Sequence, residues 1–252
     1  MAIFNTVPPL QAGAGIKFDG LTISTAAAPR NLLDNSDFTN LVAQAGIGGK
    51  HGTVAYAADR WILDSGTVSY AAGVGMTLDG TIKQKLERIP AAAYPYIGMA
   101  SGTASISYGN GTVTIVSRRG VIKWASLYTT EYSSAAVPEY QPKGYGTELI
   151  ECQLYYKRIV NGSFMIAPNV QGSAYFSNSV YVGDMRVSPS VTAVENNNGK
   201  IGVVQNISFV SKDDAEITMD TDANAISVRT TNSNYAGRQM QIFLIELSAD
   251  FV

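Results

Sequence analysis

The chain has 252 residues, of which 46% are hydrophobic and only 15% charged, with a net charge of -2. This length permits one large β domain or two small ones, and the scarcity of charge favours strands and tight turns over surface helices. A near-neutral chain without a Lys/Arg cluster argues against nucleic-acid binding by phosphate neutralisation. Between Arg88 and Arg118 no residue is charged, but scattered Gly, Ser, Thr, Asn and Pro residues argue against a membrane span, so we expect no membrane insertion.

Residues 1–30 differ in character from the rest of the chain. Their start, MAIFNTVPPL, lacks a basic region followed by an apolar core, so we do not expect it to act as a secretory signal. A short alternating apolar pattern then follows at Ile16, Phe18, Leu21 and Ile23, and it is too short to fold alone. We expect this extended segment to become ordered against a partner, although a plain edge strand behind an unstructured leader is an equal alternative.

Residues 31–146 are predicted to form a first β domain. It opens with the turn-rich NLLDNSDF of residues 31–38 and continues through a glycine-rich loop at 46–52. The predicted strands cover residues 61–63, 66–71, 75–78, 82–86, 101–108, 112–117 and 121–127. Asn110-Gly111 between two β-branched runs predicts a hairpin turn, because both residues tolerate positive φ.

Residues 147–252 are predicted to form a second β domain. Thr147 is a candidate N-cap for a short helix at residues 148–152. Strands are expected near residues 155–160, 164–166, 180–182, 191–194, 201–210, 216–219, 226–229 and 239–247. Many short strands with frequent turn signals predict an all-β fold, with a jelly-roll-like sandwich in the first domain and a β-rich second domain.

The sequence offers little for catalysis, so we predict that the protein is not an enzyme. His51 is the only histidine and lies in the glycine-rich loop, where we expect a solvated residue. Cys152 is the only cysteine, which rules out an intrachain disulfide and leaves too few ligands for a zinc site, so we expect no metal and no cofactor. The acidic residues are sparse and lie beside turns, which leaves glycan hydrolysis by a carboxylate pair unsupported.

Aromatic residues are the strongest candidates for ligand binding. Trp61 and Trp124 lie in apolar strand patterns and are interpreted as core residues, with Arg60 pairing a nearby acid. Tyr140 is interpreted as a plug at the junction of the two domains. The candidate carbohydrate-binding residues are tyrosines set among polar, Gly and Pro residues: Tyr128, Tyr132, Tyr145, Tyr94 and Tyr96. Of these, Tyr94 and Tyr96 belong to the run Tyr94-Pro95-Tyr96, which is interpreted as a loop.

Several motifs resemble the fibre and receptor-binding proteins of tailed bacteriophages. The resemblance covers roughly residues 31–252, with separated motifs in the family's order. They are NLLDNSDF at 31–38, ADRW at 58–61, AAVPEY at 135–140 followed by EL and CQLYY at 148–156, MRVSPSVT at 185–192 and ELSADF at 246–251.

The resemblance implies a virion protein, made in the host cytoplasm, that forms a tail or head fibre. It implies a homotrimer with jelly-roll-like domains that adhere to the host surface, with a host glycan as the expected ligand. Residues 1–30 would be an attachment and trimerisation segment that contacts other virion proteins through Phe4, Ile16, Phe18, Leu21 and Ile23. The alternatives are a structural capsid or tail decoration protein that does not bind the host, and a glycan depolymerase.

Overall fold

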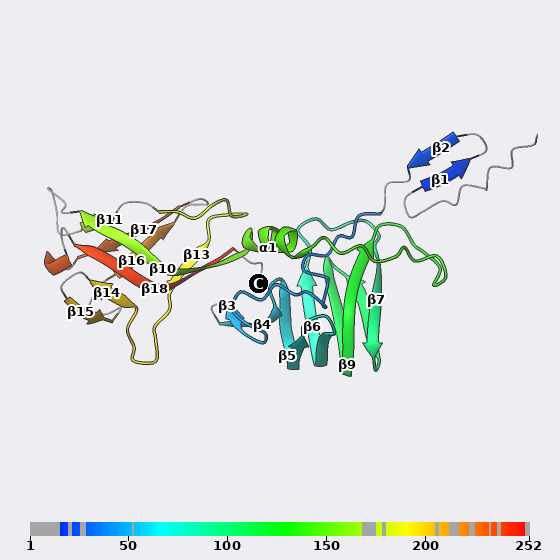
Figure 1. Ribbon diagram of the computed structural model, residues 1–252, viewed down its shortest axis with the longest axis horizontal. Coiled ribbons are helices and arrows are strands. Elements are labelled where there is room, and N and C mark those ends of the chain that lie inside the picture. The colour runs from blue at the N-terminus through cyan, green and yellow to red at the C-terminus, as the bar shows by residue number, and fades with distance from the viewer. Residues whose placement is uncertain are drawn as a thin grey trace, which may run out of the picture.

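The computed structural model describes residues 16–19, 22–25, 29–51, 53–167, 175–177, 180–204, 207–211, 217–221, 225–231, 233–235 and 238–249. Two bodies of antiparallel sheet follow one another along the molecule, and the helix α1 (Tyr145–Gln153) lies between them (Figure 1). The prediction of an all-β fold is therefore confirmed.

A separate hairpin lies in the N-terminal segment. Its strands β1 (Ile16–Asp19) and β2 (Thr22–Thr25) pair with each other and with no other described strand. Three of the predicted attachment residues, Ile16, Phe18 and Ile23, belong to this hairpin, whereas Phe4 and Leu21 lie outside the described residues. A lone two-stranded hairpin is marginally stable in water, which is consistent with the expected need for a partner.

The first body is one seven-stranded sheet in the order β3-β4-β5-β6-β9-β7, with β8 also pairing β9. Its strands are β3 (Lys50–His51), β4 (Val54–Ala58), β5 (Trp61–Ala71), β6 (Gly75–Lys85), β7 (Tyr94–Ser101), β8 (Ala104–Gly109) and β9 (Thr112–Tyr128). The predicted turn is confirmed, because Asn110 and Gly111 join β8 to β9 with φ of 50° and 72°. Several predicted strands are parts of longer ones, and β5, β6 and β9 each join two of them.

Strand β7 corrects the sequence interpretation of Tyr94-Pro95-Tyr96 as a loop. These residues begin β7, which lies at the edge of the sheet. Among the described strands, β7 pairs only with β9. An edge strand tolerates proline, because the missing N–H need not serve a second neighbour. Tyr94 and Tyr96 are therefore held in a sheet and not in a mobile turn.

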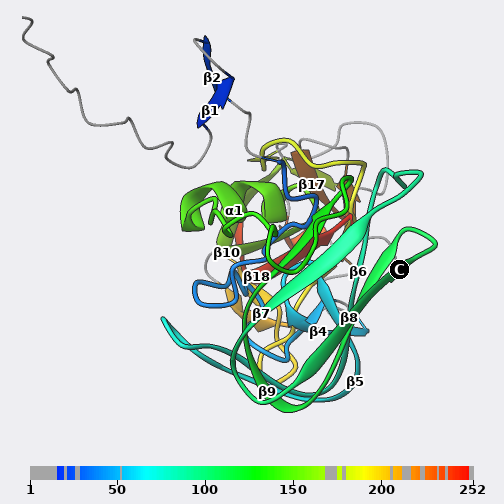
Figure 2. The ribbon, with the colours of Figure 1, turned by 90° about the vertical axis from the view of Figure 1, so that its right-hand side faces the viewer.

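The sheet curls, and the irregular segment 31–49 covers its apolar face (Figure 2). Leu33 and Phe38 from this segment are fully buried, and the Phe38 ring meets the Trp61 ring edge to face at 5.3 Å. Trp61 is itself fully buried, as predicted. In the described residues this body is one sheet closed by an irregular segment, so the jelly-roll arrangement stays a prediction.

The second body has two layers that share a core. Its elements are β10 (Tyr156–Ala167), β11 (Tyr175–Ser177), β12 (Val180–Tyr181), β13 (Ser190–Ala193), β14 (Gly202–Val204), β15 (Ile207–Val210), β16 (Ile217–Thr221), β17 (Ala225–Thr230), η1 (Ser233–Tyr235) and β18 (Gln239–Ser248). β18 pairs with β10, β13 and β14, while β17 pairs with β11, β12 and β16, and the pairing of β10 with β11 joins the two groups into one nine-stranded sheet. Buried residues of β17 and β18 belong to one hydrophobic cluster, so the two parts face each other. The strand predicted at 201–210 is the hairpin of β14 and β15.

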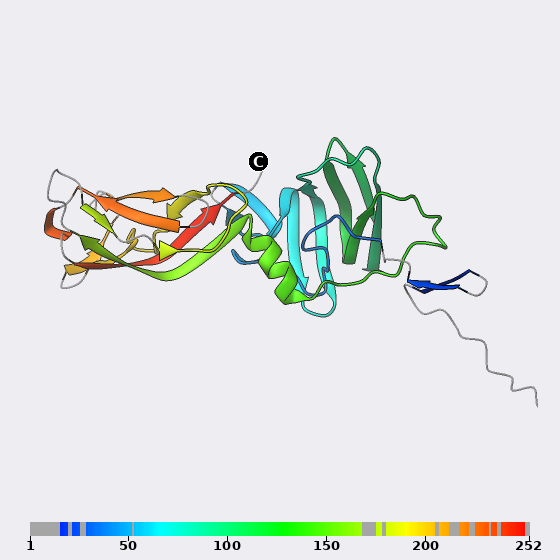
Figure 3. The ribbon, with the colours of Figure 1, turned by 90° about the horizontal axis from the view of Figure 1, so that it is seen from above.

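Helix α1 begins earlier than predicted and lies where the two bodies meet (Figure 3). Its N-cap is Gly144, with φ of 81° and no side-chain capping bond, so the assignment of Thr147 as N-cap is wrong. The helix is held by two buried side chains, Glu148 and Cys152. The predicted domain boundary after residue 146 falls inside this helix.

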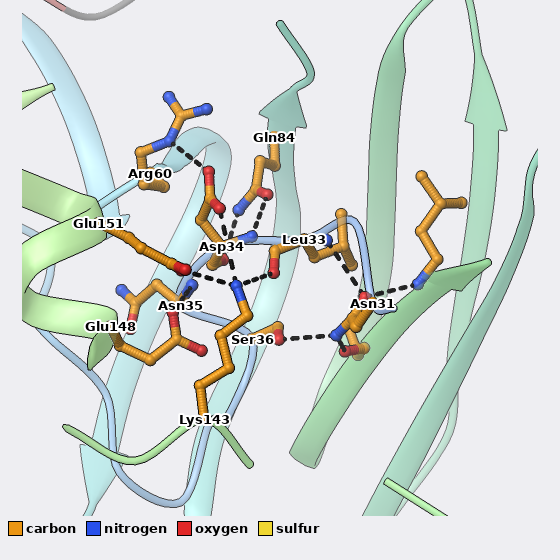
Figure 4. Close-up of polar contacts among 12 residues, drawn as sticks. Asn31, Leu33, Asp34, Asn35, Ser36, Arg60, Gln84, Lys143, Glu148 and Glu151 are labelled. Atoms are coloured by element: carbon orange, nitrogen blue, oxygen red, sulfur yellow. Dashed lines mark hydrogen bonds and ion pairs between the residues drawn. The ribbon is translucent and has the colours of Figure 1, made fainter. Parts of the chain in front are cut away.

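Asn35 connects the covering segment, the sheet and α1 (Figure 4). Its backbone N–H donates to Glu148 Oε2 at 2.6 Å, and its carbonyl accepts the Trp61 indole N–H at 2.9 Å. Its side-chain amide donates to the carbonyls of Val42 and Asp59 and accepts from the Val42 N–H. Asn35 is 1% exposed, so these bonds satisfy an amide that has no access to water.

Replacing Glu148 tests how α1 is held. We expect Glu148→Ala to lower the free energy of unfolding by about 1–3 kcal/mol, because the buried Asn35 N–H loses its acceptor. Glu148→Gln keeps an acceptor and should retain near-native stability at pH 7. Urea unfolding of the two variants measures the difference. Equal destabilisation by both would show that the side-chain oxygen at position 148 does not stabilise the fold by accepting the Asn35 N–H.

The same pair predicts a pH dependence. Burial raises the pKa of the Glu148 carboxyl, so the folded chain binds this proton more tightly than the unfolded chain. The contribution of Glu148 to the free energy of unfolding therefore falls as pH rises from the ordinary carboxyl pKa through the raised pKa of the folded state. Glu148→Gln removes that loss, so its stability relative to the native chain should be greater at pH 7 than at pH 4.

Candidate functional site

A groove of about 700 Å³ opens beside the edge strand of the first sheet. Its walls come from β7, from the end of β9 and from the long loop that leads towards α1. The residues that line it are Tyr96, Ile97, Trp124, Ser134, Val137, Pro138, Glu139 and Tyr140. The groove thus combines aromatic and aliphatic surface with hydroxyl groups and one carboxylate.

Two stacked rings form the main wall of this groove. The Trp124 and Tyr140 ring centroids are 5.2 Å apart and their planes differ by 4°. Trp124 belongs to β9, and its register partner on β7 is Gly98. The indole lies over this glycine, because a Cβ at Gly98 would come within 2.2 Å of it. The interpretation of Trp124 as a core residue is therefore wrong, because the indole is only partly buried and covers a glycine on the neighbouring strand.

Tyr140 is anchored to the covering segment. Its hydroxyl and the Ser36 Oγ lie 3.1 Å apart in a hydrogen bond. Burial is the main cause that raises the pKa of Tyr140 above its ordinary value, so the phenol stays protonated at neutral pH. These contacts place Tyr140 against the first body instead of between the two domains, where it is partly buried and also presents surface to the groove.

Three of the five predicted tyrosines form one cluster at the side of the groove. The Tyr96 hydroxyl donates to the Tyr132 carbonyl at 3.1 Å and accepts the Tyr132 N–H at 2.7 Å, which holds the loop against β7. The ring of Tyr128 lies 5.9 Å from that of Tyr96 and is only 3% exposed. Tyr128 therefore supports the wall and has no free ring face for a ligand.

The other two predicted tyrosines are placed differently. Tyr94 pairs with Tyr128 across β7 and β9 and is partly buried. Tyr145 is 46% exposed at the start of α1 and does not line the groove. Of the five, only Tyr96 lines the groove, while Trp124, Glu139 and Tyr140 were missed. Gly98 lies outside every predicted strand, so local patterns held no signal that could have found Trp124.

His51 joins the two bodies and is not solvated. It is 5% exposed and lies between two rings, with centroid distances of 3.8 Å to Tyr56 and 3.6 Å to Tyr156. Its Nε2 is 3.6 Å from the buried carboxylate of Asp59. The expectation of a solvated loop residue is therefore wrong, because Tyr156 comes from the second body, far away in the sequence.

Neither a metal centre nor a reactive thiol is found in the described part of the chain. No three His, Cys, Asp or Glu side chains there gather in a way that could hold a metal ion. Burial raises the pKa of the Cys152 thiol, so this side chain is a buried apolar contact at neutral pH. Among the described helices, none has the length and apolar character for a membrane crossing.

Comparison with known proteins gives no relative for this chain. No protein family, curated protein or solved structure matches it.

A glycine substitution tests the arrangement of the wall. We expect Gly98→Ala to displace the Trp124 indole, because the new Cβ has no room. Overpacking of this kind should cost about 1–3 kcal/mol of stability and change the near-ultraviolet circular dichroism. Gly109→Ala is the matched control, since a Cβ there meets nothing within 4 Å. Equal effects of the two substitutions would show that the indole does not cover Gly98.

Proposed function

We propose that this protein is a bacteriophage virion fibre protein that adheres to a carbohydrate on the host surface through the groove at Trp124 and Tyr140. The motif resemblance supports the class of protein. The stacked pair of rings in a groove of about 700 Å³ is the observation that carries the binding site. As a fibre, the protein would be a homotrimer attached to the virion through residues 1–30.

The chemistry of the groove suits an uncharged sugar. Apolar faces of pyranose rings pack against aromatic rings, while their hydroxyls need polar partners at the edges. Here Ser134 and Glu139 supply such partners beside Trp124, while the Tyr96 and Tyr140 hydroxyls are engaged with Tyr132 and Ser36. Glu139 is the only charged residue of the described lining, so a negatively charged sugar meets a like charge in the groove.

The same lining supports adhesion over the two alternatives. Hydrolysis of a glycan by the usual route takes two carboxyl groups flanking the bond, and the described lining supplies one, Glu139. A purely structural protein has no need for an open aromatic groove of this size, because exposed aromatic surface is costly unless it is covered or used.

Weak binding at one groove is sufficient for an adhesin. A shallow site holds each sugar weakly, but several linked copies bind together with an avidity that is greater by about 10²–10⁴ when geometry permits. We therefore expect affinity to depend strongly on the number of copies presented, as in a trimer or on a particle.

Tyr140 provides the direct test of the binding site. On a glycan array, the full-length chain should bind neutral glycans, and Tyr140→Ala should weaken this binding by roughly 10-fold, equivalent to about 1.4 kcal/mol for the loss of ring packing. Tyr140→Phe keeps the ring and loses only the hydroxyl bond to Ser36, so its binding should fall much less. In the contrary outcome, the native protein binds no glycan, and deleting the protein from the virion impairs only the stability of the particle. That outcome would support the alternative of a structural decoration protein.

Glu139 tests the preference for uncharged sugars. We expect Glu139→Gln to raise binding of uronic-acid or sialylated glycans relative to neutral ones, because it removes the like charge at the rim. Glu131→Gln is the control, since this glutamate is also exposed on the loop but does not line the groove. Native protein that prefers acidic glycans would contradict the proposed selectivity while leaving the adhesin proposal intact.

A further inference from the structure

A second cavity, of about 490 Å³, lies on the first body near the attachment of α1. Four basic and two acidic side chains line it, together with an asparagine, two leucines and a tyrosine. The lining consists of Arg30, Asn31, Leu32, Asp34, Arg60, Leu86, Glu87, Arg88, Lys143 and Tyr155. Unlike the aromatic groove, this cavity is dominated by positive charge.

The acidic charges at the cavity are already matched. Asp34 Oδ2 lies 3.2 Å from Arg60 Nε, and its Oδ1 lies 3.9 Å from Lys143 Nζ (Figure 4). Lys143 also pairs with Glu151 at 2.6 Å. On the other side, Glu87 pairs with Arg186 of the second body at 3.2 Å.

Two basic residues remain after these pairs are counted. Arg30 and Arg88 line the cavity, and neither makes an ion pair or hydrogen bond with any residue in the described ranges. Their guanidinium groups therefore leave an excess of two positive charges beside a half-enclosed cavity. Such groups bind oxyanions in a bidentate manner, with geometry that matches a phosphate.

The wall behind these arginines is rigid. Arg60 is 5% exposed, and its guanidinium lies 3.6 Å from the centroid of the Tyr155 ring. Gln84 fixes Asp34 from the opposite side, accepting from its N–H at 2.9 Å and donating to its carbonyl at 2.8 Å. A ligand would thus meet a preformed wall, and only the two exposed arginines would have to become ordered.

We propose that this cavity binds a doubly charged phosphate group between Arg30 and Arg88. The group can be free phosphate or a phosphate monoester on a sugar, since both present the same oxyanion. The site is independent of the aromatic groove, because the two cavities share no lining residue. The basic cavity thus lets the chain bind an anion. The aromatic groove disfavours such a ligand because Glu139 lies at its rim.

Calorimetric titration of the full-length chain with inorganic phosphate tests this site. At constant ionic strength, set with chloride, we expect saturable binding and a rise in melting temperature, since a ligand that binds only the folded state stabilises it. The double variant Arg30→Gln/Arg88→Gln should weaken binding at least 10-fold. Arg118→Gln is the control, an exposed arginine outside the cavity, and should leave binding unchanged.

Titration with a hexose 6-phosphate separates the two sources of the group. Tighter binding of the sugar phosphate than of inorganic phosphate would show that the site reads a glycan-borne phosphate, and equal binding would show that it reads the oxyanion alone. The proposal would be overturned if chloride raised the melting temperature as much as phosphate does. It would also be overturned if the double variant bound phosphate as tightly as the native chain. Failure of this test leaves the glycan-array result untouched, since that result depends on Tyr140.

Discussion

The buried amide of Asn35 is the constraint on which the first body depends. Its backbone has φ of 49°, a left-handed conformation that asparagine adopts more readily than most residues. That conformation turns the chain so that the side chain bonds Val42 and Asp59 while the backbone bonds Glu148 and Trp61. An apolar residue at this position would leave several buried polar groups unpaired, each at a cost of about 1–3 kcal/mol.

The short segment around Asn35 also positions both cavities. On one side, Ser36 bonds the hydroxyl of Tyr140, and Asp37 forms a backbone bridge with Trp124, so the aromatic wall is fixed to this segment. On the other side, Asn31 and Asp34 line the basic cavity. Because the segment covers a curled sheet instead of forming a strand, its successive residues can point in several directions. This explains how the eight residues 31–38 contribute both to the aromatic groove and to the basic cavity.

The sequence predicted what local patterns determine. The β content, the Asn110-Gly111 turn and the burial of Trp61 follow from residue type and short-range spacing. An acidic partner for Arg60 was also expected, but its identity, Asp34, is set by the fold, because the two residues are far apart in the sequence. The positions of Trp124 and His51 were not predictable in this way, because their surroundings come from distant parts of the chain. Trp124 is exposed to the groove because its neighbour across the strands is a glycine, and His51 is buried because Tyr156 of the second body covers it.

Helix α1 shows the same limit at a boundary. Thr147 has the chemistry of an N-cap, yet the helix starts earlier because the buried contacts of Glu148 and Cys152 decide where it lies. Lys143, just before the helix, then reaches Glu151 and the Leu33 carbonyl, which ties the end of the groove loop to the covering segment. Tertiary contacts thus set the helix register, where propensity alone suggested a later start.

The absence of a disulfide in this chain fits an assembly held by packing alone. Cys152 is the only cysteine, and it lies fully buried within α1, so in the folded chain it cannot reach a second copy. If the proposed fibre forms from several copies, they would associate through noncovalent surfaces. For the proposed fibre, the β1–β2 hairpin is a candidate starting point, because no other described strand pairs with either of its edges. Pairing there would bring several grooves onto one particle without altering the sheets that form them.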